Sequence, residues 1–245
     1  LAKLVGDGAN LAPGSRVLDL GYGCGDQTML FLKSYPIAEL VGVTSETLQS
    51  DLANRLVAAQ STSTRVHLLT GNAVDPNTWR ATPPNALPSN LTLPSSYDAV
   101  LSLDSAYHYS PSRAAMWSLA ATLLRPNGTL SCTDIILGDG APSWWIRAAI
   151  RMGVAAAGVP WANMVQQDEY VAGLKGAGFA DVVVRDISEK VFGGLADFIG
   201  SHRERVGWVV DSDRGWRQYV IMRRLLRWVD EMRLLRFVVV SARRV

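Results

Sequence analysis

The chain has 245 residues, of which 48% are hydrophobic and 19% are charged, and its formal net charge is +2. This composition allows a sizeable core and excludes a chain that stays disordered for want of apolar residues. The nearly balanced charge does not by itself indicate a nucleic-acid partner. The two cysteines, Cys24 and Cys132, are far apart. Their separation excludes a disulfide framework and a cysteine metal site, and it favours a reducing, cytoplasmic compartment.

In the first part of the chain, short apolar runs typical of buried strands alternate with segments of helical spacing. We expect strands over residues 16–20, 39–43, 65–69, 97–103 and 129–137. We expect helices over residues 27–34, 46–60 and 112–124. Residues 75–96 carry five of the eleven prolines and predict a long loop. Strands that alternate with helices at this spacing indicate an α/β protein with a doubly wound, mostly parallel sheet.

The second part of the chain is less regular. We expect helices over residues 142–159, 167–176 and 215–233, and strands over 181–186 and 236–242. The last two strands predict an antiparallel edge, which brings the sheet to seven strands. We therefore expect a single domain over residues 1–245, with residues 138–177 inserted as a helical lid. The basic helix over 215–233 is expected to pack on the sheet with a solvated basic face; contact with a membrane surface is the alternative.

Three glycines follow the first predicted strand directly. Gly21, Gly23 and Gly25 allow the backbone to turn tightly and to approach a ligand closely. Ligands of open α/β sheets bind at the carboxyl ends of the strands, where this loop lies. The spacing G-x-G-x-G departs from the G-x-G-x-x-G of dinucleotide-binding loops. The carboxylates of Asp19 and Asp26 beside the loop also favour a cationic ligand that carries an amino acid over a phosphate.

The sequence VLDLGYGCG over residues 17–25 resembles the first motif of class I S-adenosylmethionine-dependent methyltransferases. The resemblance implies a Rossmann-like methyltransferase fold and S-adenosyl-L-methionine as the cofactor. It implies cofactor contacts from this motif, made by Asp19, Gly21, Tyr22, Gly23 and Gly25. Tyr22, between the first two glycines, is further expected to reach over the methyl donor toward the substrate.

The segment GVTSETLQSDLANRLVAAQ over residues 42–60 is similar to a small-molecule subgroup of that family, which contains tocopherol C-methyltransferases. In that subgroup Thr and Gln take over contacts near the ribose and the methionine end of the cofactor, which implies these roles for Thr44 and Gln49. Ser45 can add a neutral hydrogen bond. Glu46 is a competitor for the ribose, and a solvated Gln49 is the alternative. The third strand is followed by Gly-Asn-Ala, where family members usually carry Gly-Asp-Ala. We therefore expect Asn72 and Ala73 at the adenine, with a neutral amide in place of the acid; the alternative is that Asn72 only supports the turn.

The segment SLDSAYH over residues 102–108 matches the S-[ML]-[ED]-S-x-x-H pattern of related small-molecule methyltransferases. This resemblance places Leu103 and Asp104 beside the cofactor, and Tyr107 and His108 beside the substrate. His108 is the candidate general base, because an imidazole can accept a proton near neutral pH. A structural histidine that orders the loop is the alternative, and the sequence leaves both open.

The predicted lid carries aromatic residues that we expect to contact the substrate, namely Trp144, Trp145 and Trp161. Its Arg147 and Arg151, four residues apart, lie on one helix face. An aromatic lid favours a hydrophobic acceptor, although apolar stripes of this kind also occur as ordinary core.

The sequence thus predicts an enzyme of secondary metabolism that transfers the methyl group of S-adenosyl-L-methionine to a carbon, nitrogen or oxygen atom of a small, hydrophobic acceptor. Two alternatives are a cofactor-binding scaffold without catalysis and a nicotinamide-dependent oxidoreductase on a similar sheet. We expect a small lipophilic partner, no metal and no nucleic acid. A homodimer and peripheral contact with a membrane stay open.

Overall fold

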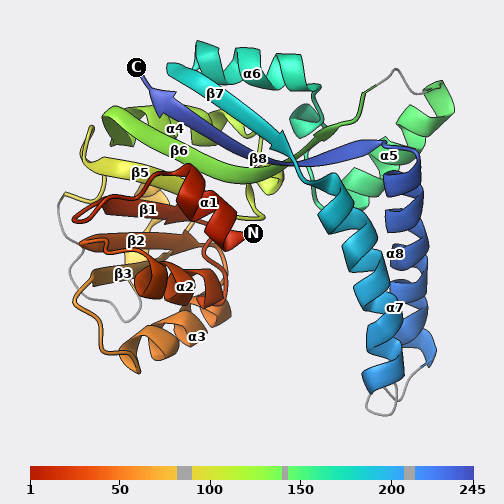
Figure 1. The fold of residues 1–245 in the computed structure, drawn as a ribbon, viewed down its shortest axis with the longest axis horizontal. Helices are drawn as coiled ribbons and strands as arrows, with labels where there is room; N and C mark the ends of the chain where they lie inside the picture. Colours follow the sequence, from red (N-terminus) through yellow and green to blue (C-terminus); the bar gives the residue numbers. More distant parts are fainter. Residues whose placement is uncertain (82–89, 140–142, 207–212) are drawn as a thin grey trace.

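The computed structural model describes residues 1–81, 90–139, 143–206 and 213–245, which Figure 1 shows as a ribbon. A twisted sheet forms the centre, with the strand order β4-β3-β2-β1-β5-β6-β8-β7. Its strands are β1 (Arg16–Leu20), β2 (Glu39–Thr44), β3 (Arg65–Thr70), β4 (Arg80–Ala81), β5 (Tyr97–Ser102), β6 (Leu124–Leu137), β7 (Phe179–Asp186) and β8 (Leu235–Arg244). The pairs β3–β2, β2–β1, β1–β5 and β5–β6 are parallel, and β8 runs antiparallel to both β6 and β7. The α/β class and the antiparallel carboxyl-terminal edge are therefore confirmed.

The sheet has eight strands, so the expected number of seven is wrong. The additional strand, β4, pairs antiparallel with β3 through Arg80 and Ala81. It lies inside the stretch predicted as a loop, where a two-residue strand is too short to show any hydrophobic period. Residues 82–89 of that predicted loop lie outside the described residues.

Helices cover both faces of the sheet because successive strand residues point to opposite sides. The helices are α1 (Ala2–Gly8), α2 (Asp26–Ser34), α3 (Thr47–Ala58), α4 (Ala114–Leu123), α5 (Trp144–Ala156), α6 (Gln167–Gly176), α7 (Gly194–Val206) and α8 (Asp213–Glu231). Val17 packs into a cluster with residues of α1, α2 and α3. The next residue, Leu18, packs into a larger cluster with residues of α4 and α6. Helix α6, the last part of the predicted lid segment, is therefore a covering helix of the sheet, and Tyr170 and Leu174 bury it there.

A helical hairpin between β7 and β8 projects away from the sheet (Figure 1). A π-helical turn over Glu189–Gly193 leads into α7, which packs along α8 and pairs Asp197 with Arg227 at 2.8 Å. We expected the basic helix to pack on the sheet, but in the described residues it packs mainly against α7. Only its carboxyl-terminal end reaches the strands, where Val229 packs with Phe237 and others. None of the helices in the described ranges is long and apolar enough to cross a bilayer.

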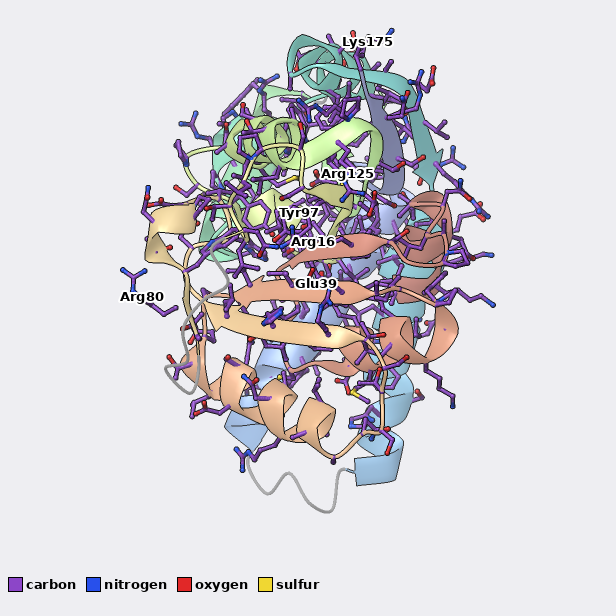
Figure 2. All side chains as sticks on the ribbon, turned by 90° about the vertical axis from the view of Figure 1, so that its left-hand side faces the viewer. Arg16, Glu39, Arg80, Tyr97, Arg125 and Lys175 are labelled. Atoms are coloured by element: carbon purple, nitrogen blue, oxygen red, sulfur yellow. The ribbon has the colours of Figure 1, made fainter. Side chains whose placement is uncertain are left out.

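At the edge of the sheet where the parallel strands begin, side chains from neighbouring strands pair with one another. Figure 2 looks at this edge and shows Arg16, Glu39 and Tyr97 close together at the start of β1, β2 and β5. Arg16 pairs with Glu39 at 2.8 Å, and its guanidinium lies 4.6 Å from the centre of the Tyr97 ring. The glycine loop and the predicted site residues lie at the opposite edge, where the parallel strands end.

Candidate active site

The glycine loop leaves β1 through three residues with left-handed backbone. The φ angles are 88° at Gly21, 62° at Gly23 and 97° at Gly25, which is the amino-terminal cap of α2. A Cβ on Gly21 would lie 2.4 Å from Ser105 Oγ, and one on Gly25 would lie 2.8 Å from Ala53 Cβ. A Cβ on Gly23 would meet no atom within 4 Å. Gly21 and Gly25 are therefore packed against the protein, and the backbone at Gly23 is open to a ligand.

Two hydroxyl groups bond to the backbone where the glycine loop leaves β1, and a third hydroxyl group contacts both of them. Ser105 Oγ and Tyr109 Oη both donate to the carbonyl of Leu20, at 3.0 and 2.9 Å. Ser102 Oγ lies 2.8 Å from Ser105 Oγ and 3.2 Å from Tyr109 Oη. Burial raises the pKa of Tyr109 above its usual range, so the phenol remains a donor at neutral pH. The sequence pattern included Ser102 and Ser105 but gave no reason to assign them this role.

Asp19 lies on β1 just before the loop and is fully buried. Both carboxylate oxygens accept from Nε2 of Gln27 at 2.8 Å. Burial raises the pKa of Asp19 to about 7, although the hydrogen bond from Gln27 opposes the shift. A buried carboxyl group with no cation beside it in the described residues suits a ligand that brings a positive charge.

We expect the stability of the ligand-free protein to depend on pH through Asp19. Between about pH 4 and pH 7 the folded state binds more protons than the unfolded state, so stability falls as pH rises through that window. Asp19→Asn removes this titration and should be more stable than the wild type at pH 8, by about 4 kcal/mol at most. Relative to the wild type, this gain should disappear near pH 4. Urea unfolding of both proteins at the two pH values measures the difference, and an equal difference at both would contradict the assignment.

Thr44 ends β2 beside the loop, and its Oγ1 donates to Oε1 of Gln49 at 2.9 Å. The structure thus brings these two predicted residues together. The bond uses the amide oxygen of Gln49, so the amide nitrogen can still donate to a ligand. Ser45 is exposed between them. Thr44 pairs in register with Thr70, the last residue of β3, so the segment after β3 lies at the same edge.

Asn72 and Ala73 follow β3. The side-chain oxygen of Asn72 accepts from the backbone N–H of Val74 at 3.1 Å, and its backbone N–H donates to Thr78 Oγ1 at 2.8 Å. Asn72 thus supports the turn, and its side chain is exposed at the strand edge, where its contact with the adenine stays a prediction. Ala73 is buried.

Tyr22 does not reach over the glycine loop, so the predicted contact of its side chain with the methyl donor and substrate is corrected. Only 1% of the residue is exposed, and it packs in the core with Leu68 and Phe31. The ring fills the space left by Gly42 on β2, where a Cβ would lie 2.6 Å from Tyr22 Cδ1. Burial raises the pKa of Tyr22 to about 12.

His108 ends a short 3-10 helix, Ala106–His108, in the segment after β5. Its exposed ring lies 4.5 Å from the ring of Tyr107, and its Nδ1 lies 3.4 Å from the carbonyl oxygen of Gly158, just past α5. Two residues before this helix, Asp104 has a φ of 54° and accepts from Tyr107 Oη at 2.5 Å. Leu103 is half-buried and packs into the core.

Asn163 holds the backbone on both sides of His108. It is fully buried, and its Nδ2 donates to the carbonyls of Tyr107 and Tyr109 at 2.9 and 3.0 Å. Its Oδ1 accepts from the backbone N–H of Arg113 at 2.7 Å. Asn163 belongs to the 3-10 turn Trp161–Asn163, so it ties the loop after β5 to the segment after α5. Sequence reasoning missed Asn163, because nothing local marks a buried amide that serves a loop 55 residues away.

Arg113 anchors this connection to the sheet. Its side chain is 2% exposed and pairs with fully buried Asp134 of β6 at 2.5 Å. It also donates to the carbonyls of Asn163 and Ile135. Tyr170 of α6 donates to the same carboxylate at 2.9 Å. This network fixes the segment between β5 and α4 that carries His108, here called the His108 loop, against β6 and α6.

The tryptophans of the predicted lid lie in two different places: Trp161 is near the His108 loop, whereas Trp144 and Trp145 are not. Trp161 packs in an apolar cluster with Tyr107, Ile146 and others, beside the His108 loop. The guanidinium carbons of Arg147 and Arg151 lie 5.6 and 5.7 Å from the centre of the Trp161 ring, which confirms that both face one side.

Trp144 and Trp145, at the start of α5, are 82% and 54% exposed. The structure does not bring them to the His108 loop, because the buried face of α5 is formed by Ile146, Ile150 and Val154.

No family model matches the chain. The sequence is similar to an erythromycin 3''-O-methyltransferase from Saccharopolyspora erythraea, at 30% identity over 205 residues. The match covers 81% of this chain and 61% of that protein, so the chain spans less than two thirds of that protein's length.

Solved structures identify the fold. A putative sarcosine dimethylglycine methyltransferase from Galdieria sulphuraria superposes with a TM-score of 0.76 at 15% identity, covering 99% of this chain and 83% of that one. Geranyl diphosphate C-methyltransferase from Streptomyces coelicolor A3(2) superposes with a TM-score of 0.71 at 15% identity, covering 100% and 78%. The chain has the methyltransferase fold. The Rossmann-like methyltransferase architecture expected from the glycine motif is thus confirmed.

Proposed function

We propose that this protein binds S-adenosyl-L-methionine at the glycine loop and transfers the methyl group to a small, lipophilic acceptor. The observation that carries the proposal is the loop itself, with an open backbone at Gly23 next to the buried carboxyl group of Asp19. The similarity to a protein named erythromycin 3''-O-methyltransferase supports it. The geranyl diphosphate methyltransferase of the same fold was solved with S-adenosyl-L-homocysteine, which supports the choice of cofactor.

The residues at the strand edge fit the parts of this cofactor. The Gly23 backbone and the Asp19 carboxylate would hold the amino-acid end, because a buried acid is stabilised by an ammonium group. Thr44 and the amide nitrogen of Gln49 would bind the ribose, and Asn72 and Ala73 would bind the adenine. When bound, the cofactor supplies a methyl group already activated on a sulfonium centre.

His108 is the residue we propose as the base. If its Nδ1 carries the proton toward the Gly158 carbonyl at 3.4 Å, Nε2 is the basic nitrogen. Nε2 would take the proton released from a hydroxyl or amino group of the acceptor as the new bond to carbon forms. Asn163 keeps the ring in place through the carbonyls of Tyr107 and Tyr109, so it is a positioning residue.

The surroundings of this loop support a hydrophobic acceptor. Tyr107 and Trp161 belong to an apolar cluster that also contains Ile150 and Met164. Apolar side chains with one convergent polar group are typical of sites for hydrophobic small molecules. We propose an acceptor that reacts through a hydroxyl or amino group, because a base is needed only when the nucleophile must lose a proton.

We expect His108→Ala to keep cofactor binding and to lose turnover by a factor of about 100 or more. Isothermal titration with S-adenosyl-L-homocysteine measures binding, and methyl transfer to a panel of lipophilic alcohols, phenols and amines measures turnover. His202→Ala is the matched control, because this histidine stacks on Phe198 of α7, away from the loop. Full turnover in the His108 variant would leave that residue a structural role only.

The same titration tests the cofactor separately. A dissociation constant in the micromolar range for S-adenosyl-L-homocysteine, with no heat from NAD, would support the methyltransferase over the oxidoreductase. Binding without turnover on any acceptor would favour the non-catalytic scaffold.

A further inference from the structure

The outer face of α5 is apolar, although the helix already buries its other side. Ile146, Ile150 and Val154 face the protein at helical spacing. The opposite side presents four residues, Trp144, Trp145, Ala148 and Met152, which we call the outer face. Trp144, Trp145 and Met152 are 82%, 54% and 70% exposed. A surface helix normally turns polar residues to water, so an apolar outer face of this kind marks a contact site.

The charged residues in the segment that carries the outer face are all of one sign. Residues 143–167 contain no aspartate or glutamate, and their only charged side chains are Arg147 and Arg151. Both arginines are exposed, and both lie over the ring of Trp161 at nearly equal distances of 5.6 and 5.7 Å. No ion pair joins either arginine to a carboxylate within the part of the chain that the structure describes. The outer face is thus bordered by two neighbouring positive charges without acidic partners.

We propose that the outer face of α5 binds the surface of an anionic lipid bilayer. Tryptophan is the residue typical of the boundary between lipid and water, and the outer face begins with two of them. Arg147 and Arg151 are placed to meet the phosphates of the lipid headgroups, where each basic residue increases binding by about fivefold.

A second copy of the chain is a poorer occupant. A twofold interface would place the same patch on both sides. The arginine pairs would then approach each other without an acid between them, and like charges at close range oppose the contact.

The location of α5 gives this contact a consequence for the site. Gly158, two residues past the end of the helix, bonds to the His108 ring. A bilayer on the outer face would therefore bind the helix whose carboxyl-terminal end adjoins the His108 ring. Binding of the bilayer itself does not depend on the proposed methyl transfer.

Flotation of the whole chain with lipid vesicles tests the proposal. We expect the protein to float with vesicles of 30% phosphatidylglycerol in phosphatidylcholine. Its binding to vesicles of pure phosphatidylcholine should be at least about tenfold weaker. Trp144→Ser/Trp145→Ser should lower binding to the mixed vesicles by at least tenfold. Arg147→Gln/Arg151→Gln should remove most of the preference for the anionic lipid. Leu48→Ser is the matched control, because Leu48 on α3 is as exposed, at 83%, as Trp144 and should leave flotation unchanged.

Two further measurements decide between the outcomes. Thermal unfolding should be the same for all these variants, because the replaced side chains are mainly exposed, and a fully folded tryptophan variant that still floats like the wild type would overturn the proposal. So would a wild type that does not float with the anionic vesicles. Sedimentation that shows a dimer, broken by the tryptophan substitutions, without flotation of the wild type would assign the outer face to a second copy instead.

Discussion

Gly21→Ala is expected to weaken binding of S-adenosyl-L-homocysteine by at least 100-fold and to destabilise the fold. Alanine at a φ of 88° costs about 1–2 kcal/mol. The new Cβ would also lie 2.4 Å from Ser105 Oγ and 2.6 Å from Ser105 Cβ, so this residue must shift. Overpacking of this kind costs about 1–3 kcal/mol. Because Ser105 and Tyr109 hold the Leu20 carbonyl, the shift would move the whole loop.

Gly23→Ala is the matched control for this prediction. The backbone conformation is similar, with a φ of 62°, but a Cβ there meets no atom within 4 Å. We expect a loss of only about 1–2 kcal/mol of stability. If the cofactor approaches the open backbone at Gly23, binding should still fall strongly. Urea unfolding and calorimetric titration of both variants separate the two effects, and unchanged binding in the Gly23 variant would place the cofactor elsewhere.

The elements predicted correctly are those whose signal is local. A buried parallel strand is a continuous apolar run, so β1 and β2 could be located from the sequence alone. The positive φ angles of the glycines agree with the tight turn that the strand–turn–helix pattern predicted. The bond between Thr44 and Gln49 joins residues five apart, within the range that a motif describes.

The features that were missed depend on pairings between distant parts of the chain. The direction of Tyr22 is decided by Gly42, which leaves room for the ring on the neighbouring strand. The position of α8 depends on its packing against α7. The spacing of the apolar residues in α8 shows that α8 is amphipathic, but it does not show which element covers its apolar face. Asn163 donates to carbonyls more than 50 residues away, and an amide in a turn carries no sign of such a partner.

The buried pair of Arg113 and Asp134 provides the largest expected effect on stability. Arg113→Met leaves the fully buried Asp134 carboxylate without its cation, and removes a donor from the carbonyls of Asn163 and Ile135. Breaking a buried pair by removing one partner costs about 3–5 kcal/mol. Arg125→Met is the control, because Arg125 pairs with Asp98 at a similar 2.7 Å but is 53% exposed. That change should cost less than about 1 kcal/mol, and urea unfolding measures both.

A second substitution shows whether the loss comes from the charge. Burial already raises the pKa of Asp134 and Arg113 opposes the rise, so loss of the guanidinium should raise the pKa further. The penalty in Arg113→Met should then shrink as pH falls, because protonation neutralises the buried carboxylate. Arg113→Met/Asp134→Asn should recover part of the lost stability at neutral pH for the same reason. Equal losses in the single and double variants would mean that the network stabilises the His108 loop through packing and the carbonyl bonds, not through compensation of the buried charge.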